Sequence, residues 1–402
     1  MKIKKIIYFT YFTFGKRDYE RFGIEIMKNN EFDVEVWDFT PFLYPEVYQK
    51  QTIPDLIDYK KHNCTLFLKY IDALNKIKYL ESDTLIISLI NFNYKTYLLF
   101  KELSKVNIPY ALLITNTIPS YKNVNNYSIP NRERLINLLR KIKNLNFEKL
   151  KRRIFCLIPF KWFCINYPEF ILAGAAQALI DYNPPIGKET RVVWGHTLDY
   201  DLYLKDLLKP SMCELKGIKY AVFIDEYWPF AEDYIFMGFK NPTTPERYYV
   251  SLCRFFNSVE KETGFKVIIA AHPRSMYEKH QDYFEGRLCL RGKTNELIRD
   301  SVFVLMHYST STNFAILYNK PVLFFVTDDM EKFKVDMDCV RAYSFVLNKQ
   351  YINIDKTYSI DWNKELIINK ETYANYKENY IKKRGTREVP FWQIAADEIK
   401  KL

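Results

Sequence analysis

The second half of the chain places a histidine, an arginine and a serine directly after an apolar stretch. Residues Lys266–Ala271 (KVIIAA) have the character of a buried strand, and His272, Pro273, Arg274 and Ser275 follow them. Pro273 disfavours the helical conformation for the residue before it, so we expect His272 on a loop at the carboxyl edge of a sheet, where doubly wound sheets bind ligands. A single histidine after a strand is often only a loop residue. The guanidinium and hydroxyl groups beside it favour an anion site instead.

Four consecutive hydroxyl side chains follow another strand in the same half. This strand ends at Met306, and Ser309, Thr310, Ser311 and Thr312 precede the next helix. Any of them is able to cap that helix, whose free N–H groups and positive dipole end suit a phosphate. Because capping needs only one hydroxyl, we predict that these residues bind a phosphate. A Ser/Thr-rich loop with a single cap is the alternative.

Two carboxylates follow a third strand. Asp225 and Glu226 come directly after Tyr220–Ile224 (YAVFI), again at the expected edge of the sheet. They are candidates to accept hydrogen bonds from ribose, base or sugar hydroxyls of the same ligand. Capping of the next segment explains two loop acids equally well.

A site that transfers a group to a hydroxyl also needs a base. The loops after the first two strands of the chain supply Asp18, Glu20 and Asp38. Asp18 is our first choice for this catalytic role. The competing interpretation is that Asp18 only caps the helix expected at 19–29.

The segments around these residues alternate between strand and helix patterns, which predicts two doubly wound parallel sheets. Further strands are expected at Lys4–Phe9, Phe32–Trp37, Thr84–Leu89, Tyr110–Thr115, Arg191–Gly195, Val302–Met306 and Pro321–Val326. Helices are expected at 18–29, 55–79, 94–104, 173–179, 245–264, 295–300, 312–318 and 370–402. This pattern is that of two Rossmann-like domains facing a cleft, the GT-B architecture, which sugar-nucleotide 2-epimerases share. We assign 1–205 to an N-terminal acceptor domain, 206–370 to a C-terminal donor domain and 371–402 to a closing helical segment, with the boundary within 196–218.

The order of these motifs resembles two groups of bacterial enzymes. The pair His272-Pro273 and the Ser/Thr run before a helix, followed by Lys320-Pro321, resemble the HP and S/T motifs of sialyltransferases and polysialyltransferases. They also resemble motifs of the CDP-glycerol and teichoic-acid polymerase transferases. His307 stands where the polymerase pattern has Asp, which speaks against a glycerophosphate donor.

The resemblance implies an inverting, metal-independent glycosyltransferase with no cofactor. Its favoured donor is a CMP-activated acidic sugar (sialic, pseudaminic or legionaminic acid, or Kdo), and its acceptor is a surface glycan or a lipid-linked glycan. His272, Ser309 and Thr310 would contact the donor phosphate. Arg274 would add positive charge there or, alternatively, would only form a surface ion pair. A CDP-glycerol or UDP-sugar transferase and a non-catalytic nucleotide-sugar-binding protein are the alternatives.

No metal site stands out in the sequence. The seven cysteines are scattered and none forms a CxxC pair, which argues against zinc and disulfides and for a reducing compartment. Asp199 and Asp201 resemble the DxD metal motif of the other large glycosyltransferase fold, which the tandem domains disfavour. We expect a structural or hinge role there, with His196 and Asp199 as minor site candidates.

The chain has a net charge of +11, and its basic residues cluster most clearly around 131–161, next to an aromatic segment. The stretch 140–163 (RKIKNLNFEKLKRRIFCLIPFKWF) has one acid, Glu148, and ends in apolar and aromatic residues. It suits either an anionic membrane surface or a basic helix followed by a buried strand. No nucleic-acid motif accompanies the charge. No stretch is long and apolar enough to span a bilayer, and we find no signal peptide, so we expect a cytoplasmic protein, peripheral on the inner face of the membrane.

Overall fold

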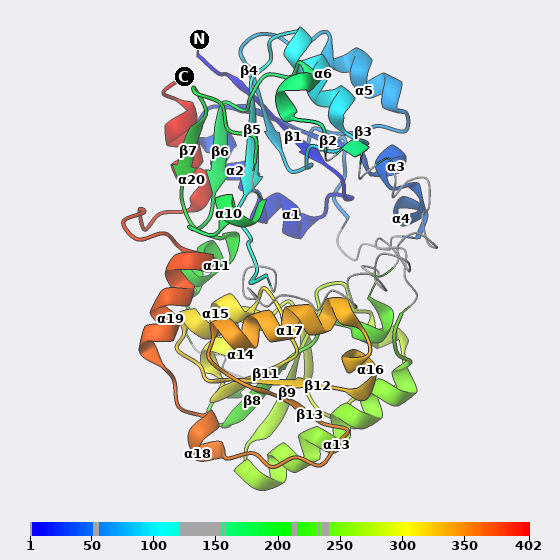
Figure 1. The fold of residues 1–402 in the computed structure, drawn as a ribbon, viewed down its shortest axis with the longest axis vertical. Coiled ribbons are helices and arrows are strands. Elements are labelled where there is room, and N and C mark those ends of the chain that lie inside the picture. The colour runs from blue at the N-terminus through cyan, green and yellow to red at the C-terminus, as the bar shows by residue number, and fades with distance from the viewer. Residues whose placement is uncertain are drawn as a thin grey trace.

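The computed structural model describes residues 2–50, 56–120, 151, 154–155, 157–182, 184–210, 215–231, 234 and 241–402. These residues form two α/β domains, one above the other in Figure 1. Each domain is built on one sheet whose strands all run parallel. A parallel sheet has both faces covered, so its strands read as continuous apolar runs.

The first sheet contains seven strands. Their order across the sheet is β3 (Cys64–Leu66), β2 (Asp33–Asp38), β1 (Lys5–Thr10), β4 (Thr84–Ser88), β5 (Tyr110–Ile114), β6 (Phe170–Ala173) and β7 (Arg191–Trp194). The helical segments of this domain are α1 (Lys16–Arg21), α2 (Ile24–Asn29), α3 (Thr40–Leu43), α4 (Pro45–Lys50), α5 (Tyr70–Ile77), α6 (Tyr97–Lys105), the short η1 (Phe160–Phe163) and α10 (Ala178–Tyr182). Of these, α1 lies on the side of the domain that faces the second domain (Figure 1).

The second sheet contains six strands. Their order is β10 (Cys289–Arg291), β9 (Lys266–Ala271), β8 (Tyr220–Ile224), β11 (Phe303–Met306), β12 (Val322–Val326) and β13 (Tyr351–Asn353). The helical segments are η3 (Trp228–Phe230), α13 (Pro245–Thr263), η4 (Tyr277–Lys279), α14 (Thr294–Asp300), α15 (Thr312–Leu317), α16 (Asp328–Glu331), α17 (Lys334–Val346) and α18 (Trp362–Glu365). Because β8 pairs with β9 on one side and β11 on the other, the loops after these three strands are neighbours.

The C-terminal segment returns from the second domain to the first. Helix α19 (Lys370–Tyr376) and the π-helical turn η5 (Lys377–Ile381) pack into the second core, and α20 (Phe391–Ile399) packs into the first. The indole Nε1 of Trp392 donates to the backbone oxygen of Arg21 at 2.9 Å. Gly23, with φ +61°, permits this contact, since a Cβ at that position would lie 2.3 Å from the Trp392 ring.

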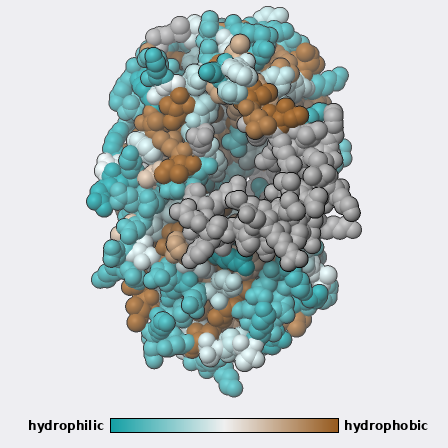
Figure 2. Space-filling model, viewed as in Figure 1, coloured by the Kyte–Doolittle hydropathy of each residue, from teal (hydrophilic) through white to brown (hydrophobic). Residues whose placement is uncertain are grey.

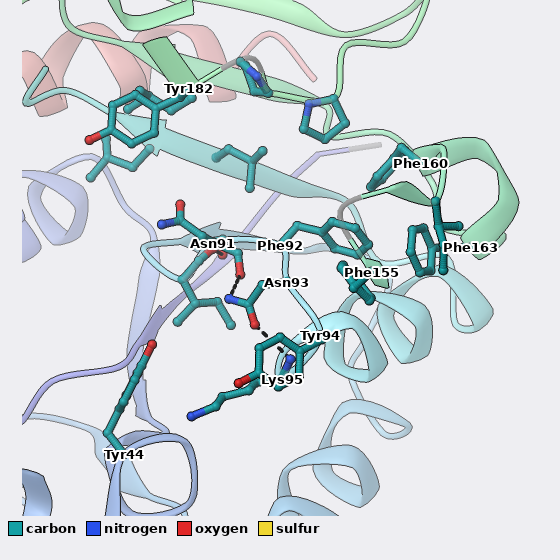
Figure 3. Close-up of a pocket in the computed structure, with 18 residues that line it drawn as sticks. Tyr44, Asn91, Phe92, Asn93, Tyr94, Lys95, Phe155, Phe160, Phe163 and Tyr182 are labelled. Atoms are coloured by element: carbon teal, nitrogen blue, oxygen red, sulfur yellow. Dashed lines mark hydrogen bonds between the residues drawn. The ribbon is translucent and has the colours of Figure 1, made fainter. Parts of the chain in front are cut away.

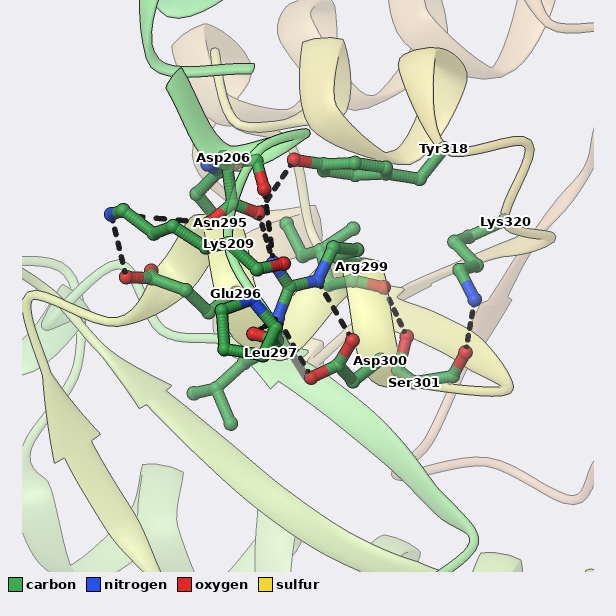
Figure 4. Close-up of polar contacts among 12 residues, drawn as sticks. Asp206, Lys209, Asn295, Glu296, Leu297, Arg299, Asp300, Ser301, Tyr318 and Lys320 are labelled. Carbon is green, nitrogen blue, oxygen red and sulfur yellow. Dashed lines mark hydrogen bonds and ion pairs between the residues drawn. The ribbon is translucent and has the colours of Figure 1, made fainter. Parts of the chain in front are cut away.

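Helix α11 (Leu198–Asp206) carries the chain in the other direction. Leu198 belongs to the first core, whereas the buried carboxylate of Asp206 accepts hydrogen bonds from Arg299 at 2.9 Å and Tyr318 at 2.8 Å in the second domain (Figure 4). Removing one partner of a buried ion pair typically costs about 3–5 kcal/mol. This pair therefore fixes the end of α11 to the second domain.

The predicted fold class, two Rossmann-like domains with a closing C-terminal helix, is confirmed. Four predicted helices differ from the structure. The helix at 18–29 is divided at Gly23, the helix at 55–79 contains β3, and the helix at 173–179 begins only at Ala178, after β6. The helix at 370–402 is interrupted between Ile381 and Phe391. The domain boundary within 196–218 stays a prediction; the sheets end at Trp194 and resume at Tyr220.

Candidate functional site

The loop after β9 is held by a carboxylate from the loop after β8. Oδ2 of Asp225 accepts the backbone N–H of His272 at 3.1 Å and the hydroxyl of Tyr277 at 2.9 Å. Oδ1 accepts the backbone N–H of Tyr227 at 2.9 Å. Asp225 is only 3% exposed, and burial raises the pKa of its carboxyl to about 6. Both oxygens are occupied by the protein itself, so its position suits holding the loop better than the direct ligand contact predicted from sequence.

His272 is presented as a neutral hydrogen-bond donor. Its Nδ1 accepts the backbone N–H of Arg274 at 3.2 Å, so the proton of the neutral ring lies on Nε2. Burial, together with the nearby charges of Arg274 and Arg17, lowers the pKa of His272 to about 4. Nε2 has no hydrogen-bond partner among the described residues and is available to a ligand.

Helix α1 of the first domain contributes two charged residues, Arg17 and Asp18, within electrostatic reach of Arg274 on the His272 loop. Burial, Arg21 and Arg274 lower the pKa of Arg17, while Asp18 and Asp199 act against them. Arg17 and Arg274 come from different domains, and both side chains keep contact with solvent. Neither guanidinium forms an ion pair within the described part of the chain. Two unpaired guanidinium groups within electrostatic reach of each other are suited to binding an anion.

Asp18 combines a capping bond with a raised pKa. Its Oδ2 accepts the backbone N–H of Gly15 at 3.1 Å, which is the bond expected of an acid at the start of a helix. Burial raises the pKa of Asp18, and the Gly15 bond, Arg17, Arg21 and Arg274 oppose that rise. Oδ1 has no hydrogen bond to any described residue. Asp18 thus takes part in capping, but as the third residue of α1 (Lys16–Arg21) and not as the cap of a helix at 19–29, and one oxygen is left free for the predicted role as a base.

Glu226 holds the loop after β11, the strand on the other side of β8 from β9. Its Oε1 accepts the backbone N–H of Tyr308 at 2.9 Å, directly before the hydroxyl run. Burial raises the pKa of Glu226 well above its usual range, and the charges of Asp336 and Asp225 add to the rise. Tyr227, the next residue, has a left-handed φ of +53°, which is costly for a tyrosine and is typical of functional loops. Asp225 and Glu226 thus align the three loops of the site.

The four hydroxyl residues divide into two groups. Thr312 is fully buried, and its hydroxyl donates to the backbone oxygen of Ser309 at 2.7 Å, so it faces the protein interior. The Oγ of Ser309 accepts the N–H of Ser311 at 3.2 Å, and Ser311 forms no side-chain cap on α15. Thr310 is exposed. The phosphate contacts predicted for Ser309, Thr310 and Ser311 stay predictions, and Thr312 is better explained as a structural residue.

Asp199 and Asp201 make structural contacts. Asp199 lies 3.5 Å from Arg21 of the first domain and accepts a hydrogen bond from Asn313 of the second at 2.9 Å. Asp201 accepts the backbone N–H of Phe391 at 2.9 Å. The structural role expected here is confirmed. The described residues contain no group of three or more His, Cys, Asp or Glu side chains that could hold a metal ion.

Sequence reasoning missed Arg17, Arg21 and Tyr277. Arg17 stands directly before Asp18, but its relation to Arg274 depends on how the domains are placed. Tyr277 lies five residues after His272 and completes the partners of Asp225. The basic pair Lys16-Arg17 at the start of a helix, where the dipole disfavours cations, was the available signal.

Comparison with known proteins shows the fold. No protein-family model matches the sequence, and no curated protein matches it. The solved structure of the wall teichoic acid polymerase TagF is similar, with a TM-score of 0.51 and 13% identity over 99% of this chain and 89% of that chain. The S. aureus MnaA–UDP structure has a TM-score of 0.47 and 12% identity over 99% of this chain and 95% of that chain. Together with the two parallel sheets, the likeness to TagF shows the GT-B fold.

Proposed function

We propose that this protein is a metal-independent, inverting glycosyltransferase that moves a sugar from a nucleotide donor to an acceptor hydroxyl. The observation that supports it is the meeting of His272 and Arg274 from the second domain with Arg17 and Asp18 from the first. Anion-binding groups and a carboxylate with one free oxygen are the two components that such a transfer needs.

The proposed reaction is a single displacement. The acceptor oxygen attacks the anomeric carbon while the bond from that carbon to the phosphate oxygen breaks. Negative charge then develops on the departing phosphate, where the Nε2–H of His272 and the guanidinium groups of Arg17 and Arg274 stabilise it. The proton of the acceptor hydroxyl passes to Asp18, whose raised pKa favours this transfer.

The favoured donor is a CMP-activated acidic sugar. This choice rests on the motif resemblance and on charge, because such a donor carries one phosphate and one carboxylate, and the site offers two guanidinium groups. A CDP-glycerol or UDP-sugar donor, with two phosphates, suits the same two groups. We place the donor on the His272 loop in either case.

Two measurements test this proposal. Thermal-shift titrations with CMP, CDP, UDP and GDP identify the nucleotide, since a ligand that binds the folded state raises its stability by about 2.7 kcal/mol at a hundredfold excess over Kd. The second measurement is the release of free nucleotide from four donors: CMP-sialic acid, CMP-Kdo, CDP-glycerol and UDP-N-acetylglucosamine. Binding without turnover of any donor would favour the non-catalytic alternative.

We further propose that the acceptor is presented at an anionic membrane surface, on the inner face of the cytoplasmic membrane. In the described part of the chain, no helix is suited to crossing a bilayer. Most of the segment 140–153 lies outside the described residues. Beyond it, Leu157 is 81% exposed and Trp162 is 69% exposed. The alternative, a basic helix followed by a buried strand, is wrong, because the short helix η1 lies where that strand was expected. Exposed apolar anchors beside a basic run are typical of interfacial segments.

A further inference from the structure

A large cavity opens at the carboxyl ends of β4 and β5 in the first domain. Its volume is about 780 Å³ (Figure 3), and no residue of the His272 loop is among those that line it. The loop 89–96 after β4 supplies one side, and residues 155–163 supply another. Figure 2 shows apolar side chains gathered on this face of the first domain, above the region between the domains.

One wall of the cavity is aromatic. Phe92 lies 4.9 Å from Phe160 and 5.2 Å from Phe163, measured between ring centroids, and Phe155 lies 4.6 Å from Phe163. These rings pack against one another and form a continuous apolar surface. It adjoins Ile158, which lines the cavity, and the exposed Leu157.

The opposite wall is polar. Asn91 is exposed, and its side-chain amide forms no hydrogen bond with a described residue. Lys95 donates to the backbone oxygen of Leu43 at 3.3 Å and lies 5.0 Å from the centroid of the Tyr44 ring. An unpaired amide, an ammonium group and a tyrosine ring are suited to sugar hydroxyls and to the apolar face of a sugar ring.

Two smaller cavities follow the large one, each sharing lining residues with the one before it, and the last is lined by helix α1. A cavity of about 240 Å³ shares Asn91 and Tyr182 with the large one and has Arg21 in its own lining. A third, of about 100 Å³, shares Arg21 and is also lined by Arg17. The shared lining residues thus run from Asn91 of the large cavity to Arg21 of helix α1, the helix that also carries Asp18.

We infer that this cavity binds the acceptor and that the acceptor is amphiphilic, with an apolar chain on the Phe92–Phe155–Phe160–Phe163 wall and a sugar at Asn91 and Lys95. The inference rests on the proposed function, because it takes the reacting hydroxyl to lie near Asp18. Asn91 also lines the smaller cavity that has Arg21 of α1 in its lining, so the sugar faces α1 and the apolar chain points towards the exposed residues Leu157 and Trp162. A water-soluble glycan without an apolar portion would leave the aromatic wall unfilled.

Isothermal titration calorimetry with lactose, butyl lactoside and octyl lactoside, each below its micelle concentration, tests this inference. Burial of each methylene strengthens binding by up to about fourfold, so octyl lactoside should bind at least about tenfold more tightly than butyl lactoside. Equal affinity for lactose and octyl lactoside would overturn the inference.

A variant that fills the cavity separates specific binding from adsorption to the surface. Asn91→Trp places a large side chain at an exposed position of the polar wall and should weaken octyl lactoside binding at least tenfold, while Tyr79→Ala, at an 85% exposed aromatic outside the cavity, should not. Unchanged binding by Asn91→Trp would contradict the inference. The nucleotide titrations on the unaltered protein report on the proposed function separately, because nucleotide binding uses the His272 loop and lactoside binding uses the cavity.

Discussion

Oδ2 of Asp225 lies 3.1 Å from the backbone nitrogen of His272 and accepts its hydrogen bond. The same oxygen accepts the hydroxyl of Tyr277, and the other accepts the N–H of Tyr227. One buried carboxylate therefore fixes the loop that presents the imidazole. Because burial raises its pKa to about 6, we expect the order of the loop to depend on pH in an accessible range.

The first prediction concerns this pH dependence. The carboxylate form of Asp225 is present above pH 6 and is lost as pH falls through about 6, so turnover should fall on the acid side. The side chain of Asp225→Asn is neutral at every pH, and its amide nitrogen donates where the loop supplies donors from His272, Tyr277 and Tyr227. It should lower turnover by about tenfold to hundredfold, the scale of a hydrogen bond to a charged group, and remove the inflection. An unchanged inflection in the variant would assign the titration to another group.

The second prediction concerns the base. Asp18→Asn removes proton acceptance and should lower turnover by about 10²–10⁴-fold. Its amide oxygen is still able to accept the N–H of Gly15, so the melting temperature should change little. Glu20→Gln, at an exposed acid of the same helix, is the matched control and should retain activity. Comparable losses in both variants would show that Asp18 has no special role.

The third prediction concerns metal ions. The carboxylates of Asp199 and Asp201 are engaged in structural contacts, and the proposed charge stabilisation comes from Arg17, Arg274 and His272. Turnover should therefore survive excess EDTA. Complete loss with EDTA, restored by Mn²⁺ or Mg²⁺, would instead support a metal-assisted reaction.

The fourth prediction concerns the membrane. Vesicle co-sedimentation should rise with anionic lipid and fall with salt. Replacing Lys149, Lys151, Arg152 and Arg153 with Ser should release the protein, since each basic side chain near an anionic surface contributes about 1 kcal/mol. Wild-type protein that stays in the supernatant at low salt would remove the membrane proposal and leave the transferase proposal standing.

Trp162→Ala separates the apolar part of this binding. Trp162 is 69% exposed, so its loss should leave the melting temperature unchanged and weaken vesicle binding by an amount that does not depend on salt. Tyr79→Ala removes another exposed aromatic outside the segment and should leave vesicle binding unchanged. A lower melting temperature for Trp162→Ala alone would mean that the side chain supports the fold.

The sequence was most informative where a long apolar run ends at polar residues. Strands β8 and β9 have the bounds predicted from their apolar runs, and the loops after them carry the predicted acids and His272. Strand β6 was missed because its apolar residues Phe170–Ala173 run directly into AGAAQAL, which has helical composition. The three-residue strands β3, β10 and β13 are too short to produce a period.

Relations between distant side chains were beyond sequence reasoning. Asp225 was predicted to contact a ligand, but its partners His272 and Tyr277 lie about fifty residues away, and only the pairing of β8 with β9 brings them together. The electrostatic effect of Arg274 on Arg17 depends on α20 and α11, which set the two domains against each other. Long-range packing decides both relations, and a local pattern does not encode it.

The turnover of His272→Ala tests the central claim most directly. The account predicts a loss of about 10²-fold or more, the scale of removing one donor to the departing phosphate, with an unchanged melting temperature. His280→Ala, at an exposed histidine of the same domain that stacks on Phe230, should keep its activity. Near-wild-type turnover in a folded His272→Ala protein would contradict the assignment of this loop as the donor site.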